Sequence, residues 1–121
     1  MNVVVITGNC FRDKTVEAFR MINLNNCAWI EEYMALNTFL NYVQFYFNKY
    51  DEFVFDGTIT HDLRHRILVK QILQQMHQYV TSMTPSFKHV IITCMPQDKE
   101  YWVYNMPSDL KITLIDLMDD G

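Results

Sequence analysis

The sequence predicts a three-layer α/β/α domain with about five mostly parallel strands. Short apolar runs rich in β-branched residues alternate with segments of helical periodicity along the chain. The runs are continuously apolar, which is typical of strands buried on both faces of a parallel sheet. The chain has 121 residues, which is room for one domain, and we expect that single α/β domain to span residues 1–121.

The first part of the chain predicts two strands separated by a short helix. Residues 1–7 (MNVVVIT) form a continuous apolar run that ends at Gly8, as in a strand buried on both faces. Residues 13–22 have helical periodicity, and we expect their apolar face to pack on the sheet. The residues of this face are Val16, Ala18, Phe19 and Ile22. Residues 27–30 (CAWI) predict a brief second strand.

Residues 31–49 predict one longer helix with two apolar faces. The first face follows the i, i+3, i+4, i+7 rule and consists of Leu36, Phe39, Leu40, Val43 and Phe47. The opposite face consists of Tyr33, Tyr42, Phe45 and Tyr46. Such a helix either packs against the protein on both sides or presents an aromatic surface to a partner.

The second part predicts three further strands and two helices. The strands cover residues 52–56 (EFVFD), 88–94 (KHVIITC) and 110–117 (LKITLIDL). Residues 60–83 have the strongest helical pattern of the chain, with Thr60 at the N-cap. Their apolar stripe consists of Leu63, Ile67, Leu68, Ile72, Leu73, Met76, Val80 and Met83. Residues 97–105 predict a short helix. Strands alternating with helices indicate right-handed crossovers in a parallel sheet.

The composition restricts the functional classes. A net charge of −4 argues against a general nucleic-acid-binding protein, because neutralising phosphates requires a basic surface. The three cysteines lie far apart in the sequence, so neither a disulfide framework nor a zinc ribbon is expected. No apolar run is long enough to span a bilayer, and we expect no signal peptide. These features indicate a cytoplasmic protein without a membrane partner.

One motif with chemical meaning lies between the first strand and the first helix. Residues 8–15 read Gly-Asn-Cys-Phe-Arg-Asp-Lys-Thr, close to the phosphate-binding pattern G-x-x-x-x-G-K-[ST]. Gly8, Lys14 and Thr15 match this pattern, whereas Asp13 replaces its second glycine. A carboxylate at that position adds bulk and a like charge beside a bound phosphate, so it weakens phosphate binding.

The chain resembles a small P-loop NTPase core, and the resemblance extends over nearly its whole length. The apolar strand that ends at Asp56 resembles the second motif, whose aspartate lies on the magnesium side. The strand that reaches Thr93 resembles the sensor strand of the RecA-like and AAA+ branch. In that branch a water-activating glutamate commonly follows the aspartate, but Gly57 stands here. The candidates for an arginine finger are Arg64 and Arg66.

The resemblance implies a site for ATP or GTP with Mg²⁺. Its phosphate-binding candidates are Gly8, Asn9, Arg12, Asp13, Lys14 and Thr15. The N–H groups from Asn9 to Thr15 would hold the phosphates, and Lys14 would neutralise the outer ones. Thr15 and Asp56 are the magnesium-side candidates, and Thr93 is the sensor candidate. The motifs follow strand ends, so we expect them to meet at the carboxyl edge of the sheet.

Other catalytic patterns are incomplete. The strand end at Asp56 resembles the D-x-D-G-T motif of haloacid-dehalogenase-like phosphatases, but Val54 occupies the position of the nucleophile. A faint likeness to nucleoside 2-deoxyribosyltransferases would require Asp56 or Asp62 as the nucleophile. His61 and His65 have chelating spacing without an evident third ligand, so we expect no resident metal site.

Aromatic residues supply the candidates for partner binding. A cluster of Tyr101, Trp102 and Tyr104 follows the fourth predicted strand, and it either covers the sheet or binds a partner. Together with the aromatic helix face, it gives the interaction candidates Tyr33, Tyr42, Tyr46, Tyr101 and Trp102. The aromatic helix face is also compatible with a homodimer.

Two functions follow from these patterns. The favoured one is a degenerate P-loop-like module that lacks hydrolysis and acts by protein–protein interaction. The content of Met, Tyr, Phe and Asn is typical of phage or mobile-element proteins, for which an accessory or inhibitor role in the host cytoplasm is expected. The alternative is a nucleotide-binding enzyme with weak or partner-dependent NTPase or phosphotransferase activity, which the intact Lys14, Thr15 and Asp56 favour.

Overall fold

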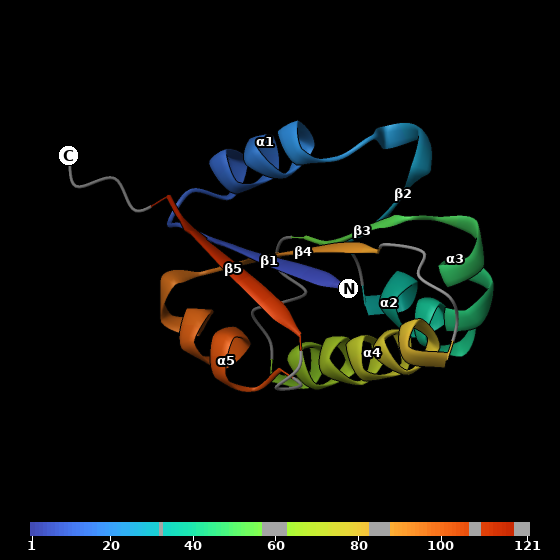
Figure 1. Ribbon diagram of the computed structural model, residues 1–121. Helices are drawn as coiled ribbons and strands as arrows, with labels where there is room; N and C mark the ends of the chain where they lie inside the picture. The colour runs from blue at the N-terminus through green and yellow to red at the C-terminus, as the bar shows by residue number, and fades with distance from the viewer. Residues whose placement is uncertain (32, 57–62, 83–87, 107–109, 118–121) are drawn as a thin grey trace.

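A five-stranded sheet forms the middle layer of the computed structural model, which describes residues 1–31, 33–56, 63–82, 88–106 and 110–117 (Figure 1). The strands are β1 (Asn2–Thr7), β2 (Cys27–Ile30), β3 (Glu52–Phe55), β4 (His89–Cys94) and β5 (Lys111–Asp116). Every pair of neighbours runs parallel, in the order β2-β3-β4-β1-β5. The predicted α/β fold with a parallel sheet is therefore confirmed, and each strand lies where the apolar runs predict it.

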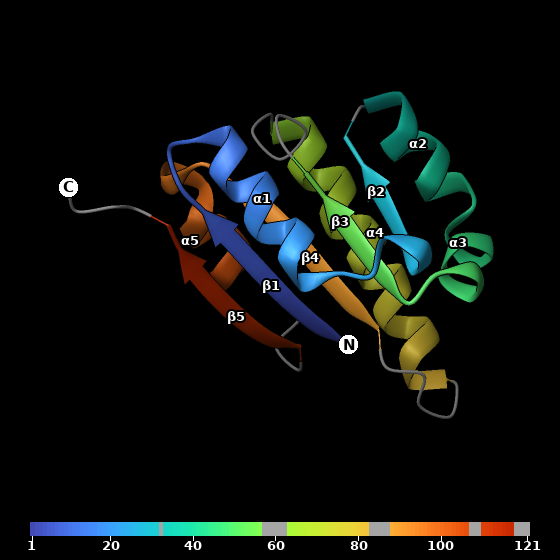
Figure 2. The ribbon, with the colours of Figure 1, turned by 90° about the horizontal axis from the view of Figure 1, so that it is seen from above.

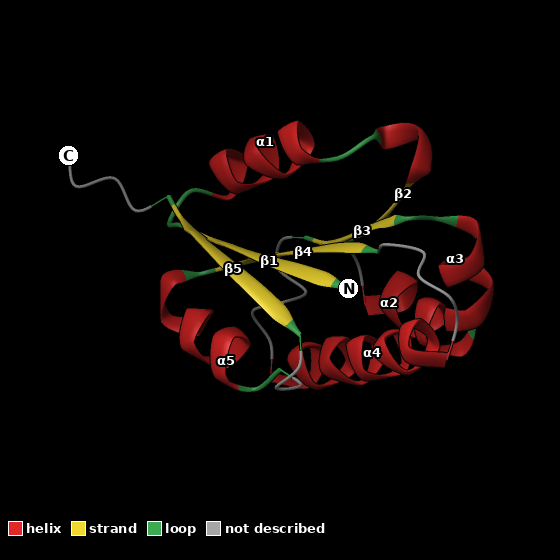
Figure 3. Ribbon diagram, in the orientation of Figure 1, coloured by secondary structure: helices red, strands yellow, loops and turns green. Residues whose placement is uncertain are grey.

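The helices cover the two faces of the sheet unequally (Figure 1, Figure 3). On one face lies α1 (Phe11–Met21). On the other lie α2 (Tyr33–Asn41), α3 (Val43–Lys49), α4 (Leu63–Ser82) and α5 (Lys99–Tyr104). Two 3₁₀ turns complete the described elements, η1 (Leu24–Asn26) and η3 (Pro96–Asp98). No helix of the described part is long and apolar enough to cross a membrane.

The chain leaves the adjacent strands β1 and β4 toward opposite faces of the sheet. It passes from β1 to α1 on one face and from β4 to α5 on the other (Figure 1). Seen from above, α1 lies along β1 and β4, which it contacts (Figure 2). In open parallel sheets, a crevice forms where neighbouring connections diverge in this way, and it is the usual place for a ligand. The carboxyl ends of β1 and β4 are therefore where a site is expected.

The core is divided by the sheet into a large and a small cluster. The large cluster lies under α2, α3, α4 and α5, and it includes Phe39, Phe53 and Trp102. The small cluster under α1 is built around Val4, Ile6, Ala18, Val54 and Ile91. The predicted apolar face is only partly covered, because Val16 is 40% exposed, whereas Phe19, 45% exposed, stacks on Trp29 of β2 with ring centroids 4.6 Å apart. A single helix presses only a narrow strip onto the sheet, and in α1 that strip holds Lys14 and Ala18.

The long helix predicted over residues 31–49 is two helices, α2 and α3. Tyr42 interrupts it with φ −124° and ψ 31°, and its N–H lies 3.1 Å from the carbonyls of both Thr38 and Phe39. The predicted first apolar face is nevertheless buried, at Leu36, Phe39, Val43 and Phe47. The bend lets both short helices contact α4.

The buried face of α4 differs from the predicted stripe. Leu63 and Ile67 are 57% and 45% exposed, so their expected burial is wrong. Ile72, Leu73 and Met76 of the predicted stripe are buried, which confirms that part of the prediction, and Val69 is buried beside them. The predicted stripe therefore holds toward the middle of the helix and fails in its first turns. Thr60 and Met83 lie outside the described residues.

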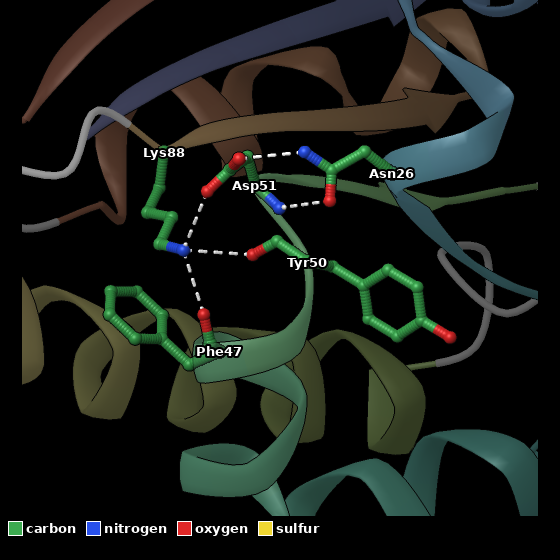
Figure 4. Close-up of polar contacts among 5 residues, drawn as sticks. All are labelled: Asn26, Phe47, Tyr50, Asp51 and Lys88. Atoms are coloured by element: carbon green, nitrogen blue, oxygen red, sulfur yellow. Dashed lines mark hydrogen bonds and ion pairs between the residues drawn. The ribbon is translucent and has the colours of Figure 1, made fainter.

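At the amino ends of β3 and β4, the buried side chain of Lys88 connects three segments of the chain (Figure 4). Lys88 is 4% exposed, and its Nζ donates to the carbonyls of Phe47 at 2.7 Å and Tyr50 at 2.9 Å. It also donates to Asp51 Oδ1 at 3.0 Å, while Asn26 Nδ2 donates to Asp51 Oδ2 at 2.6 Å. All three ammonium protons therefore have acceptors. This lock joins η1, the α3–β3 turn and the start of β4.

Candidate functional site

Three polar side chains meet at the carboxyl ends of β1, β3 and β4. Asp56 follows β3 and is 1% exposed, and Thr93 on β4 is fully buried. Thr93 Oγ1 donates to Asp56 Oδ1 at 2.7 Å. Thr15 Oγ1 lies 3.2 Å from Asp56 Oδ2 and 3.1 Å from the Phe11 carbonyl, so its single proton has two acceptors. The structure thus brings the two magnesium-side candidates and the sensor candidate into contact.

Lys14 lies beside this cluster but points into the protein. Its side chain is 3% exposed, and Nζ donates to the Cys94 carbonyl at 3.1 Å and to Met95 Sδ at 3.4 Å. Burial lowers the pKa of Lys14, and the nearby Cys94 and Asp56 oppose that shift. Both direct acceptors are neutral, so the ammonium is held without an ion pair among the described residues. Lys14 joins α1 to the end of β4.

The connection between β1 and α1 is shorter than the motif predicts. Only Gly8, Asn9 and Cys10 lie between strand and helix, and the Lys14 N–H already donates to the Cys10 carbonyl at 3.3 Å. The prediction that N–H groups as far as Thr15 line a phosphate loop is therefore wrong. Without a glycine at position 13, the chain winds directly into the helix, and the Asp13 carboxylate in the first turn favours that helix start.

Gly8 is needed where the structure places it. A Cβ built there would lie 3.2 Å from Leu117 Cβ and 3.7 Å from Lys14 Cγ. The Leu117 N–H donates to the Thr7 carbonyl at 2.8 Å, which holds the end of β5 against this turn. The glycine that the motif assigns to a phosphate thus also permits the close approach of β5 and Lys14.

Two further phosphate-binding candidates, Arg12 and Asp13, line a separate cavity beside α1, whereas Asn9 is exposed outside it. The cavity has a volume of about 700 Å³ and is lined by Cys10, Arg12, Asp13, Val16, Glu17, Arg20, Asp116 and Leu117. The side chains of Arg12 and Asp13 are therefore exposed to solvent, whereas those of Lys14 and Thr15 point toward the interior. The residues that the motif groups around one phosphate are divided between two places.

The aromatic interaction candidates have different environments. The prediction that Trp102 forms a partner surface is wrong, because it is 1% exposed and belongs to the large core cluster. Tyr101 is half-buried against it, with ring centroids 5.2 Å apart. Tyr46 is half-buried and stacks on Phe39 at 4.9 Å. Tyr42 is 60% exposed, as predicted for a surface residue. The side chain of Tyr33 lies outside the described residues.

Two charged residues near the site were not assigned a joint role by the sequence. Arg66 Nη1 donates to Asp98 Oδ1 at 3.0 Å, and the guanidinium lies 4.9 Å from the centre of the Tyr101 ring. Arg66 is therefore occupied inside the protein and does not extend from it as an arginine finger would. No sequence signal relates a residue of α4 to one in η3. His61 and Asp62 lie outside the described residues, and among the described ones no cluster of metal-ligating side chains is found.

A second cavity, which the sequence did not predict, lies at the outer edge of β2. It has a volume of about 450 Å³ and is lined by Cys27, Ala28, Trp29, Ile30, Ala35, Thr38, Phe39, Tyr46 and Tyr50. The aromatic residues predicted on the helix of residues 31–49 were the sequence feature that pointed toward this cavity. The strand edge beside it could be known only from the sheet order.

Protein-family models, curated proteins and solved structures give no match to this chain. The geometry of its own residues therefore carries the functional argument.

Proposed function

We propose that the chain is a P-loop-like module that does not hydrolyse nucleotide and acts by contact with a protein partner. The observation that carries this proposal is the position of Lys14. A P-loop lysine must reach the outer phosphates, but this ammonium is buried against the Cys94 carbonyl. The short β1–α1 connection removes part of the backbone cradle as well.

The other parts that hydrolysis requires are also missing or occupied. Gly57 follows Asp56 in the sequence, where the resemblance implies a water-activating glutamate. Arg66 is bound by Asp98 and Tyr101. The residues present do not fit a complete triphosphate site, so we derive no catalytic step from them.

A contact role is supported by exposed aromatic side chains at the start of α3, one at its N-cap and one within it. Tyr42 and Phe45 are 60% and 59% exposed. Aromatic side chains such as these are enriched where the binding energy of an interface concentrates. The composition favours an accessory or inhibitor role of the kind found in phage and mobile-element proteins.

The experiment that tests the loss of nucleotide binding is isothermal titration with ATP, GTP and their diphosphates in the presence of Mg²⁺. We expect no heat of binding at millimolar nucleotide and no shift of the melting temperature. Binding tighter than roughly 100 μM, about 5.5 kcal/mol, that disappears in Lys14→Met would overturn the proposal.

A second candidate function, binding of a Mg²⁺-nucleotide, is favoured by the Asp56 cluster. The carboxylate is buried and is met by two neutral hydroxyls, Thr15 and Thr93. Mg²⁺ is commonly held by one carboxylate together with substrate phosphates, so Thr15 and Asp56 fit its protein side. When bound, the ion would neutralise phosphate charge. Thr15→Val separates the two functions, because it removes a magnesium-side hydroxyl and leaves Tyr42 and Phe45 unchanged.

The proposal also predicts how Lys14→Met affects stability. Methionine keeps the length of the side chain and removes a buried charge, and the Cys94 carbonyl keeps the Gly8 N–H at 3.4 Å. We expect a variant at least as stable as the wild type in urea denaturation at pH 7, since a buried charge without an ion pair is costly to keep out of water.

The difference in stability between Lys14→Met and the wild type should depend on pH in a defined direction. Because burial lowers the pKa of Lys14 below 10.5, the folded state gives up the proton first as the pH rises. The cost of the buried charge is complete at lower pH and is relieved as the pH approaches 10.5. Any advantage of Lys14→Met should therefore shrink with rising pH. A large loss of stability in Lys14→Met at pH 7 would contradict this role.

A further inference from the structure

The outer edge of β2 carries backbone groups that point away from the sheet. Within the described residues, β2 ends the strand order and pairs with β3 alone. The Asp56 N–H donates to the Ile30 carbonyl at 3.0 Å, so the polar groups of Ile30 face β3. Backbone groups of successive residues in a strand point to opposite sides, and those of Trp29 therefore face outward.

The 450 Å³ cavity surrounds this edge from both faces of the sheet. Cys27 and Trp29 belong to the face covered by α1, and Ala28 and Ile30 to the opposite face. Residues of both faces line the same cavity, so it follows the strand edge itself.

The wall of the cavity is an aromatic stack held by α2 and α3. Phe39 and Tyr46 stack with centroids 4.9 Å apart and planes inclined by 10°. Tyr46 and Tyr50 continue the stack at 6.3 Å and 15°. Small residues, Ala35 and Thr38, complete this wall. A stacked wall of this kind presents apolar area with little side-chain freedom to lose on binding.

Trp29 adds an unused donor at the same edge. Its indole Nε1 is buried and has no hydrogen-bond partner in the part of the chain that the structure describes. The ring is held by stacking on Phe19, with centroids 4.6 Å apart. A buried donor without an acceptor is unfavourable, so this end of β2 is not optimised for stability.

We propose that an extended segment of a partner protein adds to β2 as a sixth strand, with alternate apolar side chains against the Phe39–Tyr46–Tyr50 wall. The outward backbone groups of Trp29 decide the class of occupant. A strand supplies N–H and C=O groups at the spacing of the edge, whereas a helix has already used its own. This inference rests on the proposed contact function and names its partner class.

The test uses a library of random peptides of about ten residues, long enough to span a strand, selected on the folded protein. Thr38→Trp fills the cavity from an exposed helix position, and Gln44→Trp, on α3 and outside the cavity lining, is the matched control. We expect enriched peptides to bind the wild type and Gln44→Trp equally and Thr38→Trp at least tenfold more weakly. N-methylation of alternate peptide nitrogens should abolish binding. The bound peptide should also slow hydrogen exchange of the backbone N–H of Trp29.

Several outcomes would overturn the inference. The first is a selection that enriches no peptide. The second is a set of peptides that bind Thr38→Trp as well as the wild type. The third is binding that tolerates N-methylation along either edge of the extended peptide. Sedimentation of the wild type and Thr38→Trp tests the other occupant, because a dimer lost only in Thr38→Trp assigns the edge to a second copy. None of these results depends on nucleotide titration, so failure here is distinguishable from failure of the proposed loss of nucleotide binding.

Discussion

Trp102→Ala should lower the free energy of unfolding by about 4 kcal/mol, as expected when a large buried aromatic side chain is truncated. Trp102 is 1% exposed in the large core cluster, where Tyr101 packs edge-on against it. The loss combines the transfer of the ring out of the core with a cavity that the surrounding side chains cannot fill. Urea denaturation followed by circular dichroism measures it.

Two variants serve as controls for the Trp102 experiment. Trp102→Phe should cost much less, because it keeps most of the apolar volume and removes an indole N–H that has no partner among the described residues. Tyr42→Ala, at a position 60% exposed, should change stability by about 0.5 kcal/mol or less. A Trp102→Ala protein of unchanged stability would contradict the core assignment and return Trp102 to the interaction candidates.

Lys88→Met should lower the free energy of unfolding by about 3 kcal/mol, the cost of leaving buried acceptors without their charged donor. The variant keeps the apolar stem of Lys88 but strands the carbonyls of Phe47 and Tyr50. Those carbonyls end α3 and lead into β3, so the α3–β3 turn should loosen first. Amide hydrogen exchange near residues 47–52 would show this local loss.

Lys99→Met is the matched control for the Lys88 experiment. Its ion pair with Asp116 is 3.5 Å long and about one-third exposed on both sides, so its removal should be nearly neutral. The hydrogen bond from Lys88 lowers the pKa of Asp51 below 3.8. That contribution is complete above pH 3.8 and is lost as the pH falls through the folded pKa, and Lys88→Met should reduce this acid sensitivity. Equal losses in the two lysine variants would contradict a specific lock.

Three strands, β1, β3 and β4, could be predicted from the sequence because their burial on both faces leaves a continuous apolar run. β4 is an example, since every residue from Val90 to Cys94 is buried. The break at Tyr42 could not be predicted, because neither proline nor glycine marks it. The exposure of Leu63 and Ile67 likewise depends on which neighbours cover the first turns of α4.

The location of the candidate site could be predicted from the sequence, but the direction in which the Lys14 side chain points could not. Asp56 and Thr93 follow apolar strands, and parallel strands bring their carboxyl ends to one edge. The acceptor that Lys14 chooses is a backbone carbonyl 80 residues away in the sequence, and no local pattern encodes that contact. A motif gives the residue types of a site, but the direction of a side chain depends on what the completed fold offers it.

The interior position of β1 in the sheet has a consequence for synthesis on the ribosome. Its two neighbours are β4 and β5, so Thr7 pairs with Cys94 and Asp116. At typical translation rates the ribosome needs on the order of ten seconds between making β1 and making β4. During that interval the segment MNVVVIT has no strand to pair with, while β2 and β3 can already associate. The nascent chain must therefore keep this apolar strand from aggregating until nearly all of the domain has emerged.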